Sequence, residues 1–427
     1  MATFVERQDS KATPRTLQEF VEACMPAAVG QANARGGESR QKYGFLALCA
    51  EVVQLDFMLR ILVDARPINP GLTGIGRYAQ NLLLSLDLLD RVEVTALVGP
   101  EGAEMMAGLR RVGLLVVEHA GDEWTQVKLP ALLEELNAEV LHSPLFVLPS
   151  RTSCPAVITI HDVIPRARPD LTSRDFLTFF EAHVPQAIRV SSRVVTVSNF
   201  SAHDFSEHFP EAREKLRVIP EPVSPMFRRD SPARVADVQR TYSLRPGYVL
   251  FLGTLDRRKG LESLLDAWAL VKNKCSGAPD LVVAGGAGGA ELDLKAAIQG
   301  RGLGRTVVTL GRVVDRDLAA LYSGASVFVF PSEYEGFGLP VLEAMACGLP
   351  VVTTRTSSIP EVAGDAALLV GVNAPEELSH ALIHMLSSHS VRQDHARRGY
   401  KRAAQFSVAS QAGKLDKLYA ELSGERR

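Results

Sequence analysis

The sequence predicts an α/β fold built from two Rossmann-like, doubly wound domains. Short apolar runs that are typical of buried parallel strands alternate with helical patterns over most of the chain. Prolines gather between positions 219 and 232 and divide these runs into two sets. The chain has 427 residues, which is enough for two domains with full hydrophobic cores.

The first set of strands begins just after Met58. A buried run at 61–63 is followed by a loop at 66–76 and an amphipathic helix at 77–89. The further strands of this set are predicted at 92–98, 114–117, 140–141, 157–160 and 194–197. These elements predict a first domain over residues 58–240.

The second set of strands begins at 248–252, after the cluster of prolines. The later members of the set are predicted at 281–284, 307–310, 327–330 and 351–353. They predict a second domain over residues 241–405, and an amphipathic helix follows near 408–422.

Residues 1–57 differ in character from the rest of the chain. They contain many polar residues and only two weak helical patterns, at 16–24 and 43–53. We expect this segment to be a loosely attached extension, or else no part of the natural protein, which would then start at Met58.

The composition argues against several classes of protein. The formal net charge of −2 gives no electrostatic basis for binding nucleic acid. The five cysteines are odd in number and form no C-x-x-C pair, which argues against a disulfide framework or a zinc site and favours the reducing cytoplasm. No charge-free apolar stretch reaches about 18 residues, so no membrane span is predicted. Peripheral contact with a membrane and the oligomeric state stay open.

The most informative segment runs from Phe328 to Val352. A short apolar strand leads into a loop with Glu335, Gly336 and Gly338, and a helix follows. The start of a helix offers free N–H groups that favour phosphate, and glycines allow the backbone to approach a ligand closely. Glu335 and Glu343 would repel a bare phosphate, but they could accept hydrogen bonds from sugar hydroxyls. The segment therefore predicts a nucleotide-sugar site, and a surface acid or a helix-capping acid is the alternative for either glutamate alone.

This segment resembles a known signature. The run from Glu335 to Pro350 reads Glu-Gly-Phe-Gly-Leu-Pro-x-Leu-Glu-Ala-Met-Ala-Cys-Gly-x-Pro and is similar to the E-x7-E motif of retaining glycosyltransferases of the GT-B fold, family four. The resemblance implies two Rossmann-like domains that face a cleft, and a C-terminal helix, about residues 406–424, that crosses back onto the first domain. It implies a nucleotide-sugar donor and no cofactor.

The resemblance also implies roles for single residues. Glu335 would contact the donor sugar, and Glu343 would take the ribose hydroxyls. The backbone around Phe337, Gly338 and Leu339 would contact the sugar or the phosphate.

A second motif follows the first strand of the second domain. Gly253 and Thr254 lead into Arg258 and Lys259 just before a helix, at the strand end where open α/β sheets bind ligands. Arg258 can hold a diphosphate through its planar fork and Lys259 as a point charge, and both would stabilise the departing nucleoside diphosphate. A solvated basic turn is the alternative. The segment resembles the family's G-T-L-E-P-R-K-N loop, which favours the functional role.

Three further strand ends carry candidates. Gly74 and Gly76 open a helix and could bring N–H groups near the donor phosphate or the acceptor, although a tight structural turn explains them equally well. The resemblance places His161 in the cleft near the donor sugar, with a structural histidine as the alternative. It places the backbone of Arg312 and Val313 at the nucleobase.

Other polar residues have weaker claims to a role in the site. Asp315-Arg-Asp317 looks like the metal-binding D-x-D motif, but we interpret Asp315 as a helix cap and Asp317 as a first-turn acid, so no metal is expected. The turn at 198–201 is interpreted mainly as a helix cap. Glu221 lies between two prolines where the family often has P-N-G, and it has no assigned role.

Together these features predict a retaining, metal-independent glycosyltransferase. We expect it to move a hexose, with mannose favoured, from GDP-mannose or a similar donor to a saccharide or lipid-linked saccharide. The loop at 253–259 is similar to that of bacterial mannosyltransferases that build O-antigen or exopolysaccharide. The resemblance thus implies lipopolysaccharide or related synthesis, which we expect in the cytoplasm, and peripheral contact with the inner membrane face stays open. A non-catalytic sugar-nucleotide-binding subunit is the alternative. A nicotinamide-dependent oxidoreductase is less favoured, because no G-x-G-x-x-G follows a strand.

Overall fold

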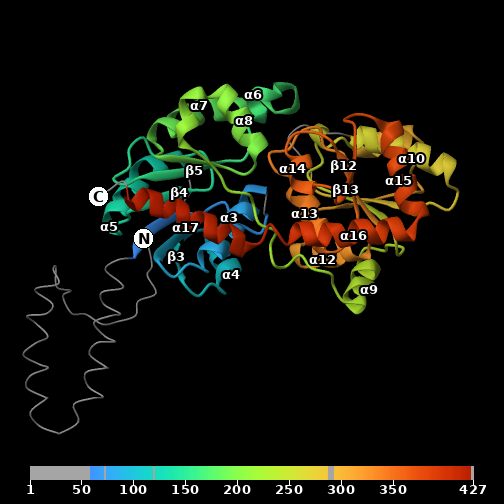
Figure 1. Ribbon diagram of the computed structural model, residues 1–427, viewed down its shortest axis with the longest axis horizontal. Helices are drawn as coiled ribbons and strands as arrows, with labels where there is room; N and C mark the ends of the chain where they lie inside the picture. The colour runs from blue at the N-terminus through green and yellow to red at the C-terminus, as the bar shows by residue number, and fades with distance from the viewer. Residues whose placement is uncertain (1–57, 72–73, 119–120, 287–292, 425–427) are drawn as a thin grey trace, which may run out of the picture.

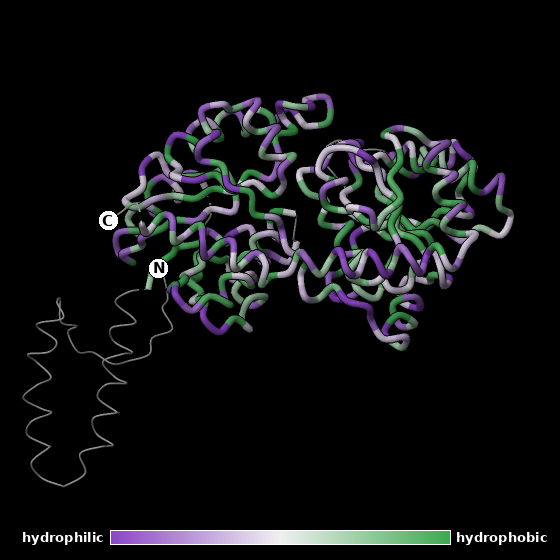
Figure 2. The backbone as a smooth tube through the Cα atoms, viewed as in Figure 1, coloured by the Kyte–Doolittle hydropathy of each residue, from purple (hydrophilic) through white to green (hydrophobic). Residues whose placement is uncertain are grey.

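The computed structural model describes residues 58–71, 74–118, 121–286 and 293–424. These residues form two lobes, each built around a parallel sheet with helices on both faces (Figure 1). The strands are the most apolar segments of both lobes (Figure 2), as expected where helices cover a parallel sheet on both sides. The expectation for residues 1–57 lies outside the described residues.

The first lobe contains a seven-stranded sheet in the order β3-β2-β1-β4-β5-β6-β7, with every pair parallel. Its strands are β1 (Leu59–Asp64), β2 (Val92–Val98), β3 (Val112–Val116), β4 (Val140–Ser143), β5 (Ala156–Ile160), β6 (Arg193–Thr196) and β7 (Leu216–Val218). Its helical segments are α3 (Gly74–Leu86), α4 (Pro100–Met106), η1 (Trp124–Lys128), α5 (Leu129–Glu135), α6 (Ile164–Ala167), η2 (Pro169–Leu171), α7 (Arg174–Val190), α8 (Asn199–His208) and η3 (Pro210–Lys215).

The second lobe contains a six-stranded parallel sheet in the order β10-β9-β8-β11-β12-β13. Its strands are β8 (Val249–Leu252), β9 (Leu281–Ala284), β10 (Val307–Gly311), β11 (Val327–Phe330), β12 (Val351–Thr354) and β13 (Ala367–Val370). Its helical segments are α9 (Pro232–Thr241), η4 (Arg257–Lys259), α10 (Leu261–Lys274), α11 (Leu294–Gly300), α12 (Asp315–Gly324), α13 (Leu339–Ala346), α14 (Ile359–Ala363), α15 (Pro375–Ser387) and α16 (His389–Ala403).

Both sheets follow the doubly wound order. In each, the chain starts in the middle, builds outward on one side for three strands, and then returns to build on the other side. The order reverses between β1 and β4 in the first sheet and between β8 and β11 in the second. The prediction of an α/β fold with two Rossmann-like domains is confirmed.

The chain passes between the lobes twice. It leaves the first lobe after β7 and returns between α16 and α17 (Val408–Gly424). The two crossing segments are joined, because the N–H of Val223 donates to the carbonyl oxygen of Phe406 at 2.8 Å.

The last helix, α17, lies along α3 of the first lobe (Figure 1). Ser85 donates to Gln411 at 2.8 Å, and the Tyr419 hydroxyl lies 2.6 Å from Nδ1 of His142. Among the described residues, no helix is both long enough and apolar enough to cross a bilayer.

Candidate active site

A cleft of about 660 Å³ lies between the two lobes. Its walls come from the loops after β8 and β11 in the second sheet and after β4 and β5 in the first. These are carboxyl ends of parallel strands at or beside the reversal of strand order, which is where doubly wound sheets bind ligands. The predicted site residues in its lining are Gly74, His161, Gly253, Thr254, Arg258, Lys259, Glu335, Phe337, Gly338, Leu339 and Glu343.

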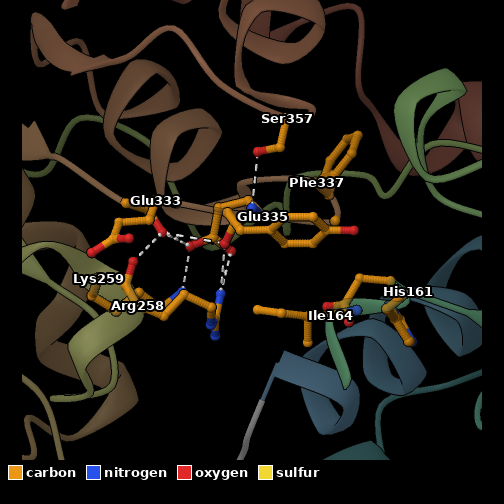
Figure 3. A network of polar contacts seen from close by, with 12 residues as sticks. His161, Ile164, Arg258, Lys259, Glu333, Glu335, Phe337 and Ser357 are labelled. Carbon is orange, nitrogen blue, oxygen red and sulfur yellow. Dashed lines mark hydrogen bonds and ion pairs between the residues drawn. The ribbon is translucent and has the colours of Figure 1, made fainter. Parts of the chain in front are cut away.

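Glu335 is the centre of a polar network in the second lobe (Figure 3). Its side chain accepts from Nζ of Lys259 at 2.5 Å and from the Ser332 hydroxyl at 2.6 Å, and Nη1 of Arg258 lies 3.2 Å away. Its own N–H donates to Ser357 at 2.9 Å. Burial raises the pKa of Glu335, but the charges of Lys259 and Arg258 outweigh burial and hold it below its usual range. The carboxylate is therefore ionised and held between two cations.

The cationic turn is built onto the acidic loop. The Arg258 carbonyl accepts from the N–H of Glu333 at 2.8 Å, and the Arg258 guanidinium donates to the Tyr334 carbonyl at 2.9 Å. Gly260 ends this turn in the left-handed region at φ +67°, and an added Cβ would lie 2.1 Å from the Pro331 carbonyl oxygen. Only glycine fits there, so the position occupied by asparagine in the family loop needs glycine in this chain.

Glu343 is also buried, with 4% of its surface exposed. The Tyr322 hydroxyl donates to its Oε2 at 2.9 Å, and Nε of Arg77 in the first lobe lies 3.9 Å from Oε1. Burial raises the pKa of Glu343, and the Arg77 charge and the Tyr322 hydrogen bond offset this only in part. The sequence analysis missed Arg77 and Tyr322. Arg77 follows the glycines that it singled out, whereas nothing in the sequence distinguishes Tyr322 from other residues on the buried face of its helix.

The interpretation of Asp315 as a helix cap was wrong. Val314 is the N-cap of α12 and no side chain caps it, while Asp315 is the first helical residue. The Asp315 carboxylate accepts from Nη2 of Arg77 at 3.1 Å. Asp315 therefore forms an ion pair with the first lobe and does not cap the helix. Asp317 is a first-turn acid as predicted, and it bonds Arg234 and Tyr242.

His161 and Glu221 pair at the junction of the lobes. Nδ1 of His161 lies 3.0 Å from Oε1 of Glu221, and Nε2 lies 3.2 Å from the Pro144 carbonyl oxygen. Glu221 belongs to the first crossing between the lobes and lines the cleft. The sequence offered one signal for it, namely an acid where the family often has asparagine.

The lobes touch directly beside the site. The Gly336 carbonyl accepts from the hydroxyls of Ser198 and Ser201 at 2.7 and 2.8 Å. A Cβ on Gly336 would lie 2.1 Å from the His161 carbonyl oxygen, so this glycine approaches the first lobe closely. Ser198 also caps α8 by accepting from the Ser201 N–H, as predicted. The Glu361 carboxylate of the second lobe accepts from two further N–H groups at the start of α8.

Three predicted site residues are not brought into the described lining of the cleft. Gly76 is buried in α3 and Val313 in the core of the second lobe. Nη2 of Arg312 donates to the Pro70 carbonyl of the first lobe at 3.4 Å. Their roles at the donor stay predictions.

Comparison with known proteins assigns the family. The family model of Glycosyl transferases group 1 matches residues 239–402, and that of Glycosyltransferase Family 4 matches residues 72–227. The O-antigen chain mannosyltransferase B of Escherichia coli is 31% identical over 375 residues, which cover 82% of this chain and 96% of that protein. The D-inositol 3-phosphate glycosyltransferase of Corynebacterium jeikeium is 36% identical over 40% of this chain and 43% of that protein.

Solved structures agree in fold. HepE of Anabaena, in complex with UDP-glucose, aligns with a TM-score of 0.68 at 20% identity, over 85% of this chain and 100% of that chain. Sucrose-phosphate synthase from Thermosynechococcus elongatus aligns with a TM-score of 0.67 at 19% identity, over 86% and 100%. The chain belongs to the glycosyltransferase family described as Glycosyl transferases group 1 and Glycosyltransferase Family 4, and its fold is GT-B.

Proposed function

We propose that this protein is a retaining, metal-independent glycosyltransferase in cell-surface polysaccharide synthesis. It transfers a hexose, with mannose favoured, from GDP-mannose or a similar donor to a saccharide or lipid-linked saccharide. The observation that carries the proposal is the convergence of Arg258, Lys259, Glu335 and Glu343 on one cleft at the strand ends. The reaction would take place in the cytoplasm or at the inner membrane face.

The charge balance of the site supports a diphosphate ligand. Glu335 pairs with the two cations of the turn. A diphosphate would compete for both cations, because it carries more than one negative charge. Glu335 would then be released to accept hydrogen bonds from the hydroxyls of the transferred sugar. The start of α13 has no side-chain cap, so its backbone N–H groups add favourable potential for the phosphates.

The transfer step follows from the same groups. The bond between the anomeric carbon and the leaving phosphate oxygen breaks, and that oxygen accepts the proton of the attacking hydroxyl on the same face of the sugar. The new bond forms on this face, so the anomeric configuration is retained. Arg258 and Lys259 stabilise the charge that develops on the nucleoside diphosphate. Closure of the lobes, which touch at Gly336, would limit the access of water during transfer.

The identity of the relatives supports mannose as the sugar. The most extensive curated match reported above is an O-antigen chain mannosyltransferase. The serotype-specific mannosyltransferase WbdA of Escherichia coli is also similar, at 27% identity over 62% of this chain, although the match spans only 33% of WbdA.

A donor screen tests the proposal. The full chain is mixed in turn with GDP-mannose, UDP-glucose, UDP-galactose and NADH, and both the melting temperature and slow donor hydrolysis are measured with and without EDTA. We expect GDP-mannose to give the largest stabilisation and to be hydrolysed in EDTA, and NMR of the transfer product should show the donor's anomeric configuration. Stabilisation without turnover would support a non-catalytic binding subunit, and stabilisation by NADH alone would contradict the proposal.

A further inference from the structure

The lining that the first lobe contributes after β4, after β5 and around the start of α7 is largely apolar. This part, the apolar half, is lined by Leu145, Phe146, Ile164, Leu171, Thr172, Ser173, Phe176 and Phe180. None of these side chains is charged. His161, Asp162 and Glu221 line the same cleft.

Three aromatic rings shape the apolar half. Phe146 follows β4 and meets Phe180 of α7 edge-on, with ring centroids 5.3 Å apart. Phe176, one turn earlier in α7, lies with its centroid 6.5 Å from that of Phe146. Phe146 and Phe180 are buried, whereas Phe176 is 38% exposed. The Phe176 N–H donates to Ser173, the N-cap of α7, so its backbone position is fixed.

An exposed ring among the uncharged side chains of the apolar half suits one kind of polar ligand. The face of an aromatic ring carries partial negative charge, and the C–H bonds on one side of a pyranose present the opposite sign. The edge of the sugar ring still carries hydroxyls, and the carboxylates of Asp162 and Glu221 in the same cleft can accept hydrogen bonds from them.

The same lining is unsuited to a phosphorylated acceptor. Phosphate is recognised by lysine, arginine or several backbone N–H groups. In the described lining of the cleft, Arg77 is the one lysine or arginine from the first lobe, and it already pairs with Asp315 at 3.1 Å.

We propose that the apolar half binds a neutral pyranose ring of the acceptor, stacked on Phe176, and that the acceptor is an uncharged saccharide at this end rather than a phosphorylated polyol. The inference rests on the proposed function, because it takes the other half of the cleft as the donor site. It extends that function by naming the chemistry of the acceptor.

Transfer from GDP-mannose to two probes tests this inference. The probes are a methyl α-mannobioside and myo-inositol 1-phosphate, and saturation-transfer NMR measures the binding of each. We expect the mannobioside to bind and the phosphate to bind far less. In Phe176→Leu, which keeps an apolar side chain but removes the ring, the KM for the mannobioside should rise about two- to twelvefold, because ring contacts contribute roughly 0.5–1.5 kcal/mol. Phe176→Tyr should restore it.

Phe179→Leu is the matched control. Phe179 lies on the same helix, is 39% exposed and packs against Phe146 at 5.7 Å, but it is outside the described lining of the cleft. Its replacement should leave both transfer and donor hydrolysis unchanged. The inference would be overturned by an unchanged KM in Phe176→Leu or by an equal rise of KM in Phe179→Leu. It would also be overturned if the mannobioside did not bind, or if the inositol phosphate were the better acceptor. If Phe176 contacted a lipid chain instead of a sugar ring, Phe176→Leu would leave the KM of the acceptor unchanged.

The failure of the proposed function would be seen separately. If the wild-type chain neither binds nor hydrolyses any nucleotide-sugar, the donor assignment fails, whereas NMR binding of the two probes still reports on the apolar half.

Discussion

The imidazole of His161 donates to the carboxylate of Glu221, 3.0 Å away, at the point where the chain first leaves the first lobe. The other ring nitrogen faces the Pro144 carbonyl oxygen at 3.2 Å. Both partners offer acceptor oxygens, so a protonated ring would donate from both of its nitrogens. Burial alone would lower the pKa of His161, but the hydrogen bond and charge of Glu221 outweigh it and raise the pKa.

Glu221→Gln should therefore change how stability depends on pH. A raised histidine pKa gives stabilisation that is fully present below the unfolded pKa of about 6.5 and is lost as pH rises through the folded pKa. The variant should melt below the wild type at pH 6, and the gap should narrow by pH 9. Asp162, which both proteins keep, also raises the pKa of His161, so the variant should retain part of this stabilisation. Thermal unfolding at both pH values measures the gap, and an equal gap at the two would contradict an ionised pair.

Glu335→Gln should separate the binding of nucleotide from the transfer of sugar. Transfer should fall about 10²- to 10³-fold, as for the loss of a polar contact at a reacting centre. GDP alone should bind more tightly, because Lys259 and Arg258 no longer pair with a carboxylate. Calorimetry with GDP and a transfer assay measure the two effects, and circular dichroism checks the fold. Full transfer activity in the variant would refute the role of Glu335.

Lys259→Ala should weaken the binding of GDP and also abolish the transfer of sugar. The ammonium group that would contact the diphosphate is gone, and the buried Glu335 keeps only Arg258 as a cation. We expect transfer to be lost and GDP to bind at least tenfold more weakly, while circular dichroism shows that the fold is retained. Wild-type affinity for GDP would show that the turn does not hold the diphosphate.

Tyr322→Phe should weaken the binding of the donor through Glu343. The change removes the hydroxyl that donates to Oε2 of Glu343 and leaves a buried acceptor with one partner fewer, at a cost of about 1–3 kcal/mol. The KM for the donor should rise along with a loss of stability in urea. Tyr242→Phe is the control, because it removes a similar bond to Asp317 outside the cleft. It should lower stability and leave the KM unchanged, and equal KM values in both variants would count against Glu343 as a donor ligand.

Gly336→Ala should hold the lobes apart. Its new Cβ would lie 2.1 Å from the carbonyl oxygen of His161, the residue after β5. We expect transfer to fall at least tenfold and X-ray scattering to show a wider particle. Gly99→Ala is the control, because an added Cβ there meets nothing within 4 Å. Normal activity in Gly336→Ala would mean that the contact is not needed in the reacting state.

The sequence alone predicted where the loops of the candidate site lie, because each of them directly follows one strand. The loop with Glu335 and the turn with Lys259 each follow one strand, and parallel strands bring their carboxyl ends to the same edge of a sheet. The missed strands β7 and β13 are edge strands of three and four residues, and β7 has an arginine at its centre. A three-residue run with a central charge has no apolar pattern, so the sequence does not distinguish β7 from a loop. The apolar run of β13 is as long as those of β9 and β11, so its length does not explain why it was missed.

Pairings between distant segments were beyond the sequence analysis. The pattern around Asp315 is that of a helix start, but Arg77, 238 residues earlier, draws its carboxylate into an ion pair. In the same way, Glu221 pairs with His161 because the end of β5 lies beside the crossing segment. The sequence around either residue does not indicate the other as its partner. Contacts of this kind follow from the register and docking of whole lobes.

The bond between Val223 and Phe406 joins the two places where the chain crosses between the lobes. Two crossing segments joined in this way would form a hinge, about which we expect the lobes to open. Access for substrates would then be widest on the far side, where Gly336 meets Ser198 and Ser201. Because Glu221 lies two residues from Val223, opening of the lobes about this hinge would move the carboxylate that contacts His161.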